Sequence, residues 1–417
     1  MNILRSYLIF LFLLTLFITI YNPFGAKAQT HYDLLGRMNV VSTAVPFLMI
    51  TPDSRSGAMA DAGVAIPTDP NAIHWNTAKL AFATDDMGLS ISYVPWLRSL
   101  VPDINLSYLS GFKRIDAMST FGASLRYFSL GDIDFTNEQG QGIGSFRPNE
   151  LAVDGAYARK LSEKFSLGLA LRFIYSNLTG GTPVNGTQPT KAGTAFAGDL
   201  SGFWKGGNFT FMKKVCNMNF GVNISNVGSK ITYTDQTQRD FIPMNLRVGT
   251  YINCVIDDYN QIALAVDLNK LLVPTAPIYK TDSSGNSILG PNGQLVILYG
   301  KNPNQPVIEG IIQSFTDAPG GFKEEIREIN PSVALEYWYN KQFAARGGYF
   351  YEHPTKGNRQ YVTLGLGLKY NILNIDVSYL IPTSGKTANQ ASPLQNTLRF
   401  SLIFNFGSEK DKNKKKK

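Results

Sequence analysis

The stretch Phe165-Ser-Leu-Gly-Leu-Ala-Leu-Arg-Phe-Ile-Tyr175 alternates large apolar residues at odd positions with small or charged residues at even positions, and only Ile174 departs from the pattern. Side chains on a β-strand point to opposite faces in turn, so this segment predicts a strand with one apolar and one polar face. In a soluble sandwich the apolar face would pack a core. In a membrane barrel it would contact lipid, and the polar face would line the lumen.

The same alternation recurs in about fourteen segments of about ten residues between Met87 and Phe406. The joints alternate in length. Short joints include Gly206–Cys216, Lys341 alone and Tyr370-Asn371, and long joints cover 130–148, 177–193, 229–241, 271–330 and 381–395. Outer-membrane barrels have short periplasmic turns and long extracellular loops. We therefore predict an all-β outer-membrane barrel of about 14 antiparallel strands over residues 86–406, with both chain ends in the periplasm.

The two ends of the chain favour the membrane barrel. Residues 1–28 have the features of a cleaved secretory signal, with Arg5, an apolar run over 6–20 and the small-x-small site Ala26-Lys27-Ala28. The run is shorter than the ~20 residues of a transmembrane helix, which disfavours an uncleaved anchor. The last segment, 396–406, resembles the C-terminal strand of bacterial outer-membrane barrels. A chain in lipid without long apolar helices must close a barrel to pair its backbone groups.

The net charge of +8 does not indicate a nucleic-acid partner. Part of this charge lies in the signal. The basic tail of residues 407–417 carries six Lys against Glu409 and Asp411, which leaves the barrel itself near +2. We expect a solvated tail, with contact to anionic lipid or a periplasmic partner as the alternative.

Residues 29–85 predict a periplasmic or plug segment, because they are too rich in Gly, Pro and apolar residues for a solvated arm. Its candidate motif comprises Pro46, Phe47, Pro52, Asp53, Arg55, Gly57, Asp61, Gly63, His74, Trp75 and Asn76. We expect Asp53 and Arg55 to form a buried ion pair that holds the plug.

The predicted lumen face of the strands carries balanced charges. The set comprises Arg126, Arg172, Arg247, Arg346, Arg399, Asp154, Asp199, Asp267, Glu336 and Asp376. An ion-selective pore is usually biased to one sign, whereas balance suits a plugged lumen with many ion pairs. The alternative is that these charges are scattered and hydrated.

The joint 271–330 is too long to be a structureless loop in a compact protein unless it is functional. Two segments, 307–315 and 322–329, predict short amphipathic helices, and Pro319-Gly320-Gly321 separates them. The candidate docking residues are Ile308, Ile311, Ile312, Phe315, Pro319, Gly320, Gly321 and Phe322. The alternative is that this loop only caps the barrel.

No set of residues predicts catalysis, a metal site or a cofactor. The three His residues are scattered, and Cys216 and Cys254 have no neighbour at metal spacing. Both Cys lie at periplasmic ends of one predicted hairpin, so they form either a disulfide or two free thiols. We therefore expect a protein that is not an enzyme.

The stretches Ala44–Ala65 and Asp69–Phe82 closely resemble the PorV family, an outer-membrane barrel of the Bacteroidota type IX secretion system. Asp317–Ser332 resembles the long-loop signature of the same family. The resemblance covers essentially the whole mature chain and implies a fold similar to FadL, a fourteen-stranded barrel with an N-terminal plug. Two positions depart from the family pattern, Ala60 in place of Gly and Thr77 in place of Pro, which puts only the local backbone geometry in doubt.

The resemblance implies a non-catalytic role. Proteins of this family bind the C-terminal signal domain of secreted cargo at the cell surface, beside a large translocon barrel. They deliver the cargo to a sortase-like attachment complex that joins it to lipopolysaccharide. The alternatives are a FadL-like channel for hydrophobic small molecules, which needs an apolar lumen, and a lipid A-modifying hydrolase, which needs a nucleophile and an acid that do not stand out.

Overall fold

The computed structural model describes residues 36–98, 101, 103–136, 139–181, 190–234, 239–384, 392 and 394–407. The predicted signal over 1–28, the predicted mature start at Gln29 and the tail from residue 408 onward lie outside the described residues.

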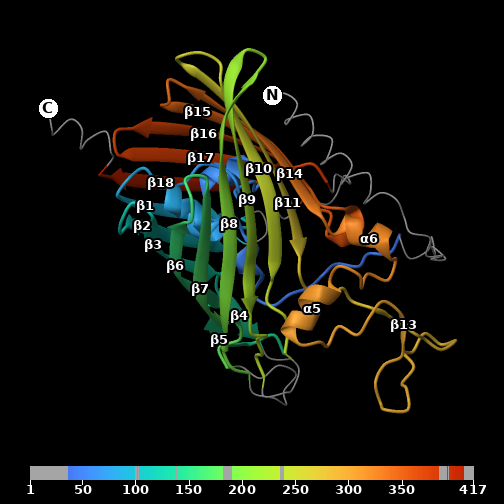
Figure 1. The fold of residues 1–417 in the computed structure, drawn as a ribbon. Helices are drawn as coiled ribbons and strands as arrows, with labels where there is room; N and C mark the ends of the chain where they lie inside the picture. Colours follow the sequence, from blue (N-terminus) through green and yellow to red (C-terminus); the bar gives the residue numbers. More distant parts are fainter. Residues whose placement is uncertain are drawn as a thin grey trace.

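Fourteen antiparallel strands close into one barrel, which confirms the predicted architecture (Figure 1). The strands are β1 (Met87–Pro95), β2 (Asn105–Arg114), β3 (Ser119–Ser129), β6 (Asn149–Lys160), β7 (Phe165–Asn177), β8 (Gly193–Phe211), β9 (Lys214–Gly228), β10 (Asn245–Val255), β11 (Asn260–Leu271), β14 (Asn330–Tyr339), β15 (Phe343–Tyr351), β16 (Gln360–Tyr370), β17 (Leu373–Pro382) and β18 (Thr397–Phe406). Neighbours along the chain are neighbours in the barrel, and β18 pairs with β1 from Met87 opposite Phe406. Closure removes the sheet edges that lipid could not satisfy.

The alternation along each strand separates the two faces of the wall. On β7 the apolar odd positions point outward, so that Leu167, Leu169 and Leu171 are exposed, and the even positions are buried inside. All ten charged residues assigned to the lumen face are buried, which confirms that assignment. The exposed apolar stripe is the surface that contacts lipid in an outer-membrane barrel.

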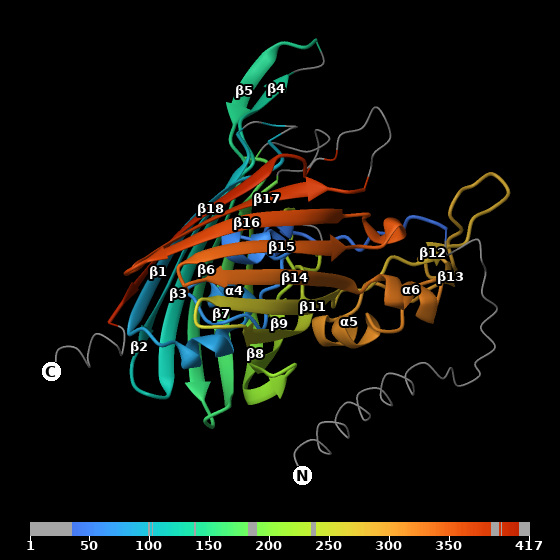
Figure 2. The same cartoon turned by 90° about the horizontal axis from the view of Figure 1, so that it is seen from above.

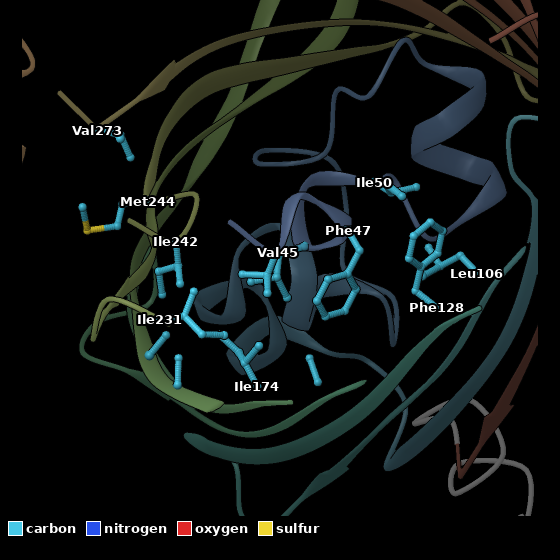
Figure 3. Packing of buried hydrophobic residues seen from close by; sticks show 14 of the residues in the cluster. Val45, Phe47, Ile50, Leu106, Phe128, Ile174, Ile231, Ile242, Met244 and Val273 are labelled. Atoms are coloured by element: carbon cyan, nitrogen blue, oxygen red, sulfur yellow. The ribbon is translucent and has the colours of Figure 1, made fainter. Parts of the chain in front are cut away.

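The N-terminal segment lies inside the barrel. It forms η1 (Pro46–Met49), α3 (Ser54–Ala58), α4 (Ala72–Trp75) and η2 (Thr77–Phe82), all short elements within the ring of strands (Figure 2). Towards the end with long loops, its apolar residues pack on lumen-facing side chains such as Leu106 and Phe128, and Figure 3 shows Phe47 beside Phe128. Small residues on the wall make room for this segment. A Cβ on Gly168, for example, would come within 2.4 Å of the Ala78 nitrogen.

The long loops carry the remaining elements, which are β4 (Ile133–Thr136), β5 (Gly142–Phe146), β12 (Ile278–Tyr279), β13 (Ile297–Tyr299), α5 (Val307–Gln313), α6 (Phe322–Arg327) and η3 (Pro354–Lys356). The two helices predicted in the longest loop are confirmed. The two small hairpins, β4–β5 and β12–β13, were not predicted, because strands of two to five residues are too short to show a period. No helix among the described residues is long and apolar enough to span a membrane.

The hairpin of β8 and β9 is longer than the sequence predicted. The joint expected at Gly206–Cys216 is instead strand, and the chain reverses at Met212 and Lys213, which both have positive φ. A bulge between Lys205 and Asn208 interrupts the pairing of β8 with β9. It also breaks the alternation of apolar and polar residues from which a strand is predicted. Close to this turn, Cys216 lies opposite Cys254 on β10, and the structure joins the two in a disulfide.

We expect Leu171→Arg to destabilise the barrel, because Leu171 is exposed in the middle of β7 and faces the hydrocarbon. A lipid-facing arginine near the bilayer midplane costs about 2–4 kcal/mol. Denaturant unfolding in lipid vesicles should show this loss, and Leu171→Ala should show a clearly smaller one. Equal losses would mean that this face does not lie in the hydrocarbon.

Candidate functional site

Asp53 joins the two halves of the inner segment. Its carboxylate accepts a hydrogen bond from the Ser56 backbone N–H at 2.8 Å, which caps α3, and one from the Trp75 indole N–H at 2.6 Å. Asp53 and Trp75 are both fully buried. A buried carboxylate with such donors is a structural anchor, because its lone pairs are already engaged.

Gly63, Trp75 and Asn76 fit the inner segment closely to the wall. The Gly63 and Val64 N–H groups donate to Asp267 on β11 at 2.7 and 2.9 Å. A Cβ on Gly63 would lie 2.2 Å from the Trp75 ring, so only glycine fits there. The Asn76 amide donates to the Val64 and Gly202 carbonyls, both at 3.0 Å.

The expected Asp53–Arg55 ion pair is wrong. Arg55 instead makes a two-pronged contact with Glu336 on β14, at 3.1 Å through both Nε and Nη2. Glu336 also receives the Arg346 Nε at 2.7 Å, and Arg346 in turn pairs with Asp376. Arg55 follows the capping residue Asp53 by two positions in α3, so its side chain leaves the helix towards the wall rather than back to Asp53. The sequence could not show which wall strand would face it.

Among the other motif residues, three contact side chains of the lumen wall. Pro46 begins η1, Phe47 stacks on Phe128, and Pro52 is buried just before α3. Gly57 lies against Arg399, and Asp61 accepts a hydrogen bond from Tyr361. Ala60 and Asp61 both have positive φ. The family glycine at position 60 is thus replaced by an alanine in the left-handed region, which such a residue adopts at a cost of about 1–2 kcal/mol.

His74 is not a base in this setting. Its Nδ1 lies 2.6 Å from Arg126 Nη2, and Arg126 also donates to the Leu48 carbonyl at 2.7 Å. Burial, followed by the charge of Arg126, lowers the pKa of His74 well below its ordinary value. The neutral ring is therefore a hydrogen-bond partner that helps Arg126 hold the inner segment.

At the end with long loops, α5 buries one face and exposes the other. Val307 and Ile311 pack against the apolar cluster inside the barrel mouth, while Ile308, Ile312 and Phe315 are exposed. The expectation that Ile311 is exposed is thus wrong, because it is half-buried on the packed face, one helical turn from Val307. The exposed three follow a spacing of four and three residues, which defines one stripe.

The helix α6 is oriented with its acidic face inward. Glu324, Glu325 and Glu328 are buried, while Phe322, Ile326 and Ile329 are exposed. These three repeat the four-and-three spacing of α5. Pro319 and Gly320 are half-buried, and Gly321, at positive φ, is exposed where α6 begins. We name Ile308, Ile312, Phe315, Phe322, Ile326 and Ile329 the apolar loop faces.

Two lysines hold α6 in this orientation. Lys270 Nζ, at the end of β11, lies 2.6 Å from Glu328 and 3.2 Å from Glu325. Lys356 Nζ, in η3, lies 2.6 Å from Glu324 and 2.8 Å from Glu328. We name these five residues the lysine–glutamate clamp. The sequence alone did not reveal this clamp, although Glu324, Glu325 and Glu328 are spaced to share one helix face.

The two lysines of the clamp act on the pKa of Glu328. Burial alone would raise the pKa of Glu328, but Lys270 and Lys356 together hold it below its ordinary value. Asp317, which accepts a hydrogen bond from the Thr275 N–H at 3.1 Å, has no lysine partner among the described residues. Burial, with Glu325 and Glu328 nearby, raises the pKa of Asp317 to about 6. Within the described ranges, no three His, Cys, Asp or Glu side chains are arranged to hold a metal ion.

A family model described as "Type IX secretion system protein PorV" matches residues 35–278. No curated protein sequence matches the chain significantly. Among solved structures, the toluene transporter TbuX of Ralstonia pickettii is 12% identical with a TM-score of 0.46, over 85% of this chain and 98% of that one. The toluene transporter TodX of Pseudomonas putida is 13% identical with a TM-score of 0.44, over 84% and 95%. A Pseudomonas aeruginosa FadL homologue is 12% identical with a TM-score of 0.40, over 88% and 100%.

We expect Lys356→Met to release α6 from the barrel mouth. The change leaves Glu324 and Glu328 buried with one cation fewer, and breaking a buried pair in this way costs about 3–5 kcal/mol. Hydrogen exchange of the backbone over 318–329 should accelerate at least tenfold. Lys280→Met, which alters an exposed lysine of the same loop, should leave the exchange unchanged. If both variants exchange like the wild type, the clamp does not hold the helix.

We expect the α5–α6 region to be more protected at pH 5.5 than at pH 7.5. The folded pKa of Asp317 is raised, so its contribution to stability is complete below its unfolded pKa and is lost as the pH rises through about 6. Glu328, whose pKa is lowered, stays ionised at both values. Protection factors over 307–329, corrected for intrinsic exchange, should fall severalfold between the two pH values. Asp317→Asn should remove the difference, while Glu309→Gln, on the exposed side of α5, should retain it.

Proposed function

The chain belongs to the PorV family of type IX secretion system proteins, and from this membership we propose that it is a cargo-binding shuttle of the outer membrane. It binds the C-terminal signal domain of exported cargo at the cell surface. It receives the cargo beside the large translocon barrel and delivers it to the sortase-like complex that attaches cargo to lipopolysaccharide. It performs no catalysis itself.

The observation that carries the proposal is the pair of apolar loop faces. Six large apolar side chains are exposed on α5 and α6 or within two residues of their C-terminal ends, at the end of the barrel with long loops. An amphipathic helix normally buries its apolar face, yet α6 buries its glutamates instead. Exposed apolar side chains gathered in this way mark an interaction surface. The signal domain of the cargo is the occupant that family membership implies.

The clamp supports binding by a preformed surface. Because Lys270 and Lys356 hold the glutamates of α6 inside, Phe322, Ile326 and Ile329 are presented before any partner arrives. A surface that is already ordered loses less entropy on association, so modest contact area suffices for binding. A shuttle must also release its cargo, and a surface of six side chains suits weak to moderate affinity.

The packed lumen also supports a shuttle rather than a passage. The inner segment is bonded to several sides of the wall, through Arg55 to β14, Gly63 to β11 and Asn76 to β8. The lumen side chains around it are charged and paired, as with Arg172 between Asp154 and Asp199. The apolar side chains of the lumen, such as Leu106 and Phe128, are already packed against the inner segment, so they are not free to contact a hydrophobic small molecule.

The test is affinity capture from gently solubilised outer membranes. We compare the tagged wild type with Ile308→Ser/Ile312→Ser and Phe322→Ser/Ile326→Ser, and with Ile115→Ser, an exposed apolar residue in a short turn at the opposite end. The wild type and Ile115→Ser should recover secreted proteins that share a C-terminal domain. Each double variant should recover at least tenfold less cargo.

Two results would contradict the proposal. Undiminished cargo on both double variants would show that the apolar loop faces do not bind it. A folded wild-type barrel that recovers lipid or small hydrophobic molecules but no secreted protein would favour the channel alternative. A heat-modifiable band on gels confirms that each variant is folded.

A further inference from the structure

A polar cavity of about 480 Å³ opens at the barrel end with short turns, on the far side of the inner segment from the apolar loop faces. Its wall includes the amide side chains Asn208, Asn217, Asn219, Asn253 and Gln261. Four of these amides, all but Asn219, make no side-chain hydrogen bond to any described residue. Phe82 and Phe203 add aromatic surface beside them. Short turns are periplasmic in outer-membrane barrels, so the cavity faces the periplasm.

One side of this cavity ends in an unpaired strand edge. β7 begins at Phe165, which lies opposite Trp204, and the last bond between the strands runs from the Lys205 N–H to the Lys164 carbonyl at 2.7 Å. β8 nevertheless continues to Phe211, paired only with β9 on its other side. Figure 1 shows this part of β8 and β9 rising above the start of β7.

The register shows which backbone groups this edge presents. The hairpin turns at Met212 and Lys213, so Phe211 and Lys214 flank a two-residue turn. Such flanking residues exchange both their hydrogen bonds, and the pattern alternates along an antiparallel ladder. The N–H and C=O groups of Thr210 and Asn208 therefore point to the open edge. No described backbone group bonds to them there.

The hairpin that carries this edge is held to β10 close to its turn. The disulfide Cys216–Cys254 joins β9 to β10, and Lys214 Nζ donates to the Ile256 carbonyl at 2.7 Å. The edge is thus a fixed template rather than a loose extension. Open edges of this kind are usually shielded, because they invite pairing with another chain.

The lining side chains that have no oppositely charged partner are positively charged. The acidic lining residues Asp69 and Asp376 are paired with Arg55 and Arg346, and Asp85 also has an interaction partner. The lining lysines Lys205, Lys341 and Lys369 have no carboxylate partner within the described chain. Lys164, Lys213 and Lys214 flank the edge itself. An acidic ligand complements this set.

We propose that the edge of β8 over residues 206–211, together with this cavity, binds an extended acidic polypeptide segment of a periplasmic protein. The segment adds a strand beside Asn208 and Thr210, where β7 no longer covers β8. Its acidic side chains lie among the lysines, and its amides meet those of Asn217 and Asn253. Backbone edge groups select a polypeptide over a glycan.

The test measures binding of a fluorescent ten-residue peptide of alternating Glu and Val to the detergent-solubilised full chain. The decisive variant is Asn208→Pro/Thr210→Pro, which removes both edge N–H donors and leaves the ladder with β9 intact. Its control, Asn208→Val/Thr210→Val, keeps the donors and loses the side-chain polar groups. Anisotropy should show saturable micromolar binding to the wild type, less than threefold weakening for the Val control, and at least tenfold weakening for the Pro variant.

A second variant covers the case in which the prolines disturb the hairpin. Lys205→Glu/Lys369→Glu should weaken binding of the Glu–Val peptide at least tenfold and should improve binding of a Lys–Val peptide. The proposal is overturned if the wild type shows no saturable binding, if folded Pro and Val variants bind equally, or if the Lys–Val peptide binds the wild type as well as the Glu–Val peptide. Cargo capture through the apolar loop faces, at the other end of the barrel, is independent of every one of these results.

Discussion

The structure depends on the pairing of charges inside the barrel. Strand alternation directs ten charged side chains into a narrow interior where all of them are buried. An unpaired charge in such a place costs several kcal/mol, so each must find an opposite charge or several hydrogen bonds. The wall meets part of this need alone, as Arg172 does with Asp154 and Asp199. The inner segment meets another part, because Arg55 completes Glu336 and the Gly63 and Val64 N–H groups complete Asp267.

The same requirement explains the two ends of the barrel. At the end with long loops, Lys270 and Lys356 need carboxylates, and α6 supplies three by turning its acidic face inward. Because the acidic face points inward, the apolar residues Phe322, Ile326 and Ile329 are exposed on the surface. At the end with short turns, Phe82 of the inner segment lines the polar cavity. There the lining lysines Lys205, Lys341 and Lys369 have no carboxylate partner among the described residues.

Much of the fold could be predicted because lipid imposes a simple rule on each strand. Leu167, Leu169 and Leu171 had to face outward, so Arg172 had to face inward, without knowledge of any neighbour. Helices α5 and α6 were also predictable from their own period. The contacts between segments were not. Arg55 meets Glu336 across 281 residues of chain, and no local pattern distinguishes that partner from the nearby Asp53.

The sequence by itself determined the strand count, the faces of the wall and the presence of an inner segment, since each follows from residues adjacent along the chain. Only the tertiary structure decided which face of α6 is exposed, because the buried lysines that orient it come from β11 and η3. Only the tertiary structure, likewise, left β8 uncovered beyond Trp204, because an unpaired edge depends on where the neighbouring strand begins. The candidate binding surfaces at both ends therefore arise from relations between distant segments.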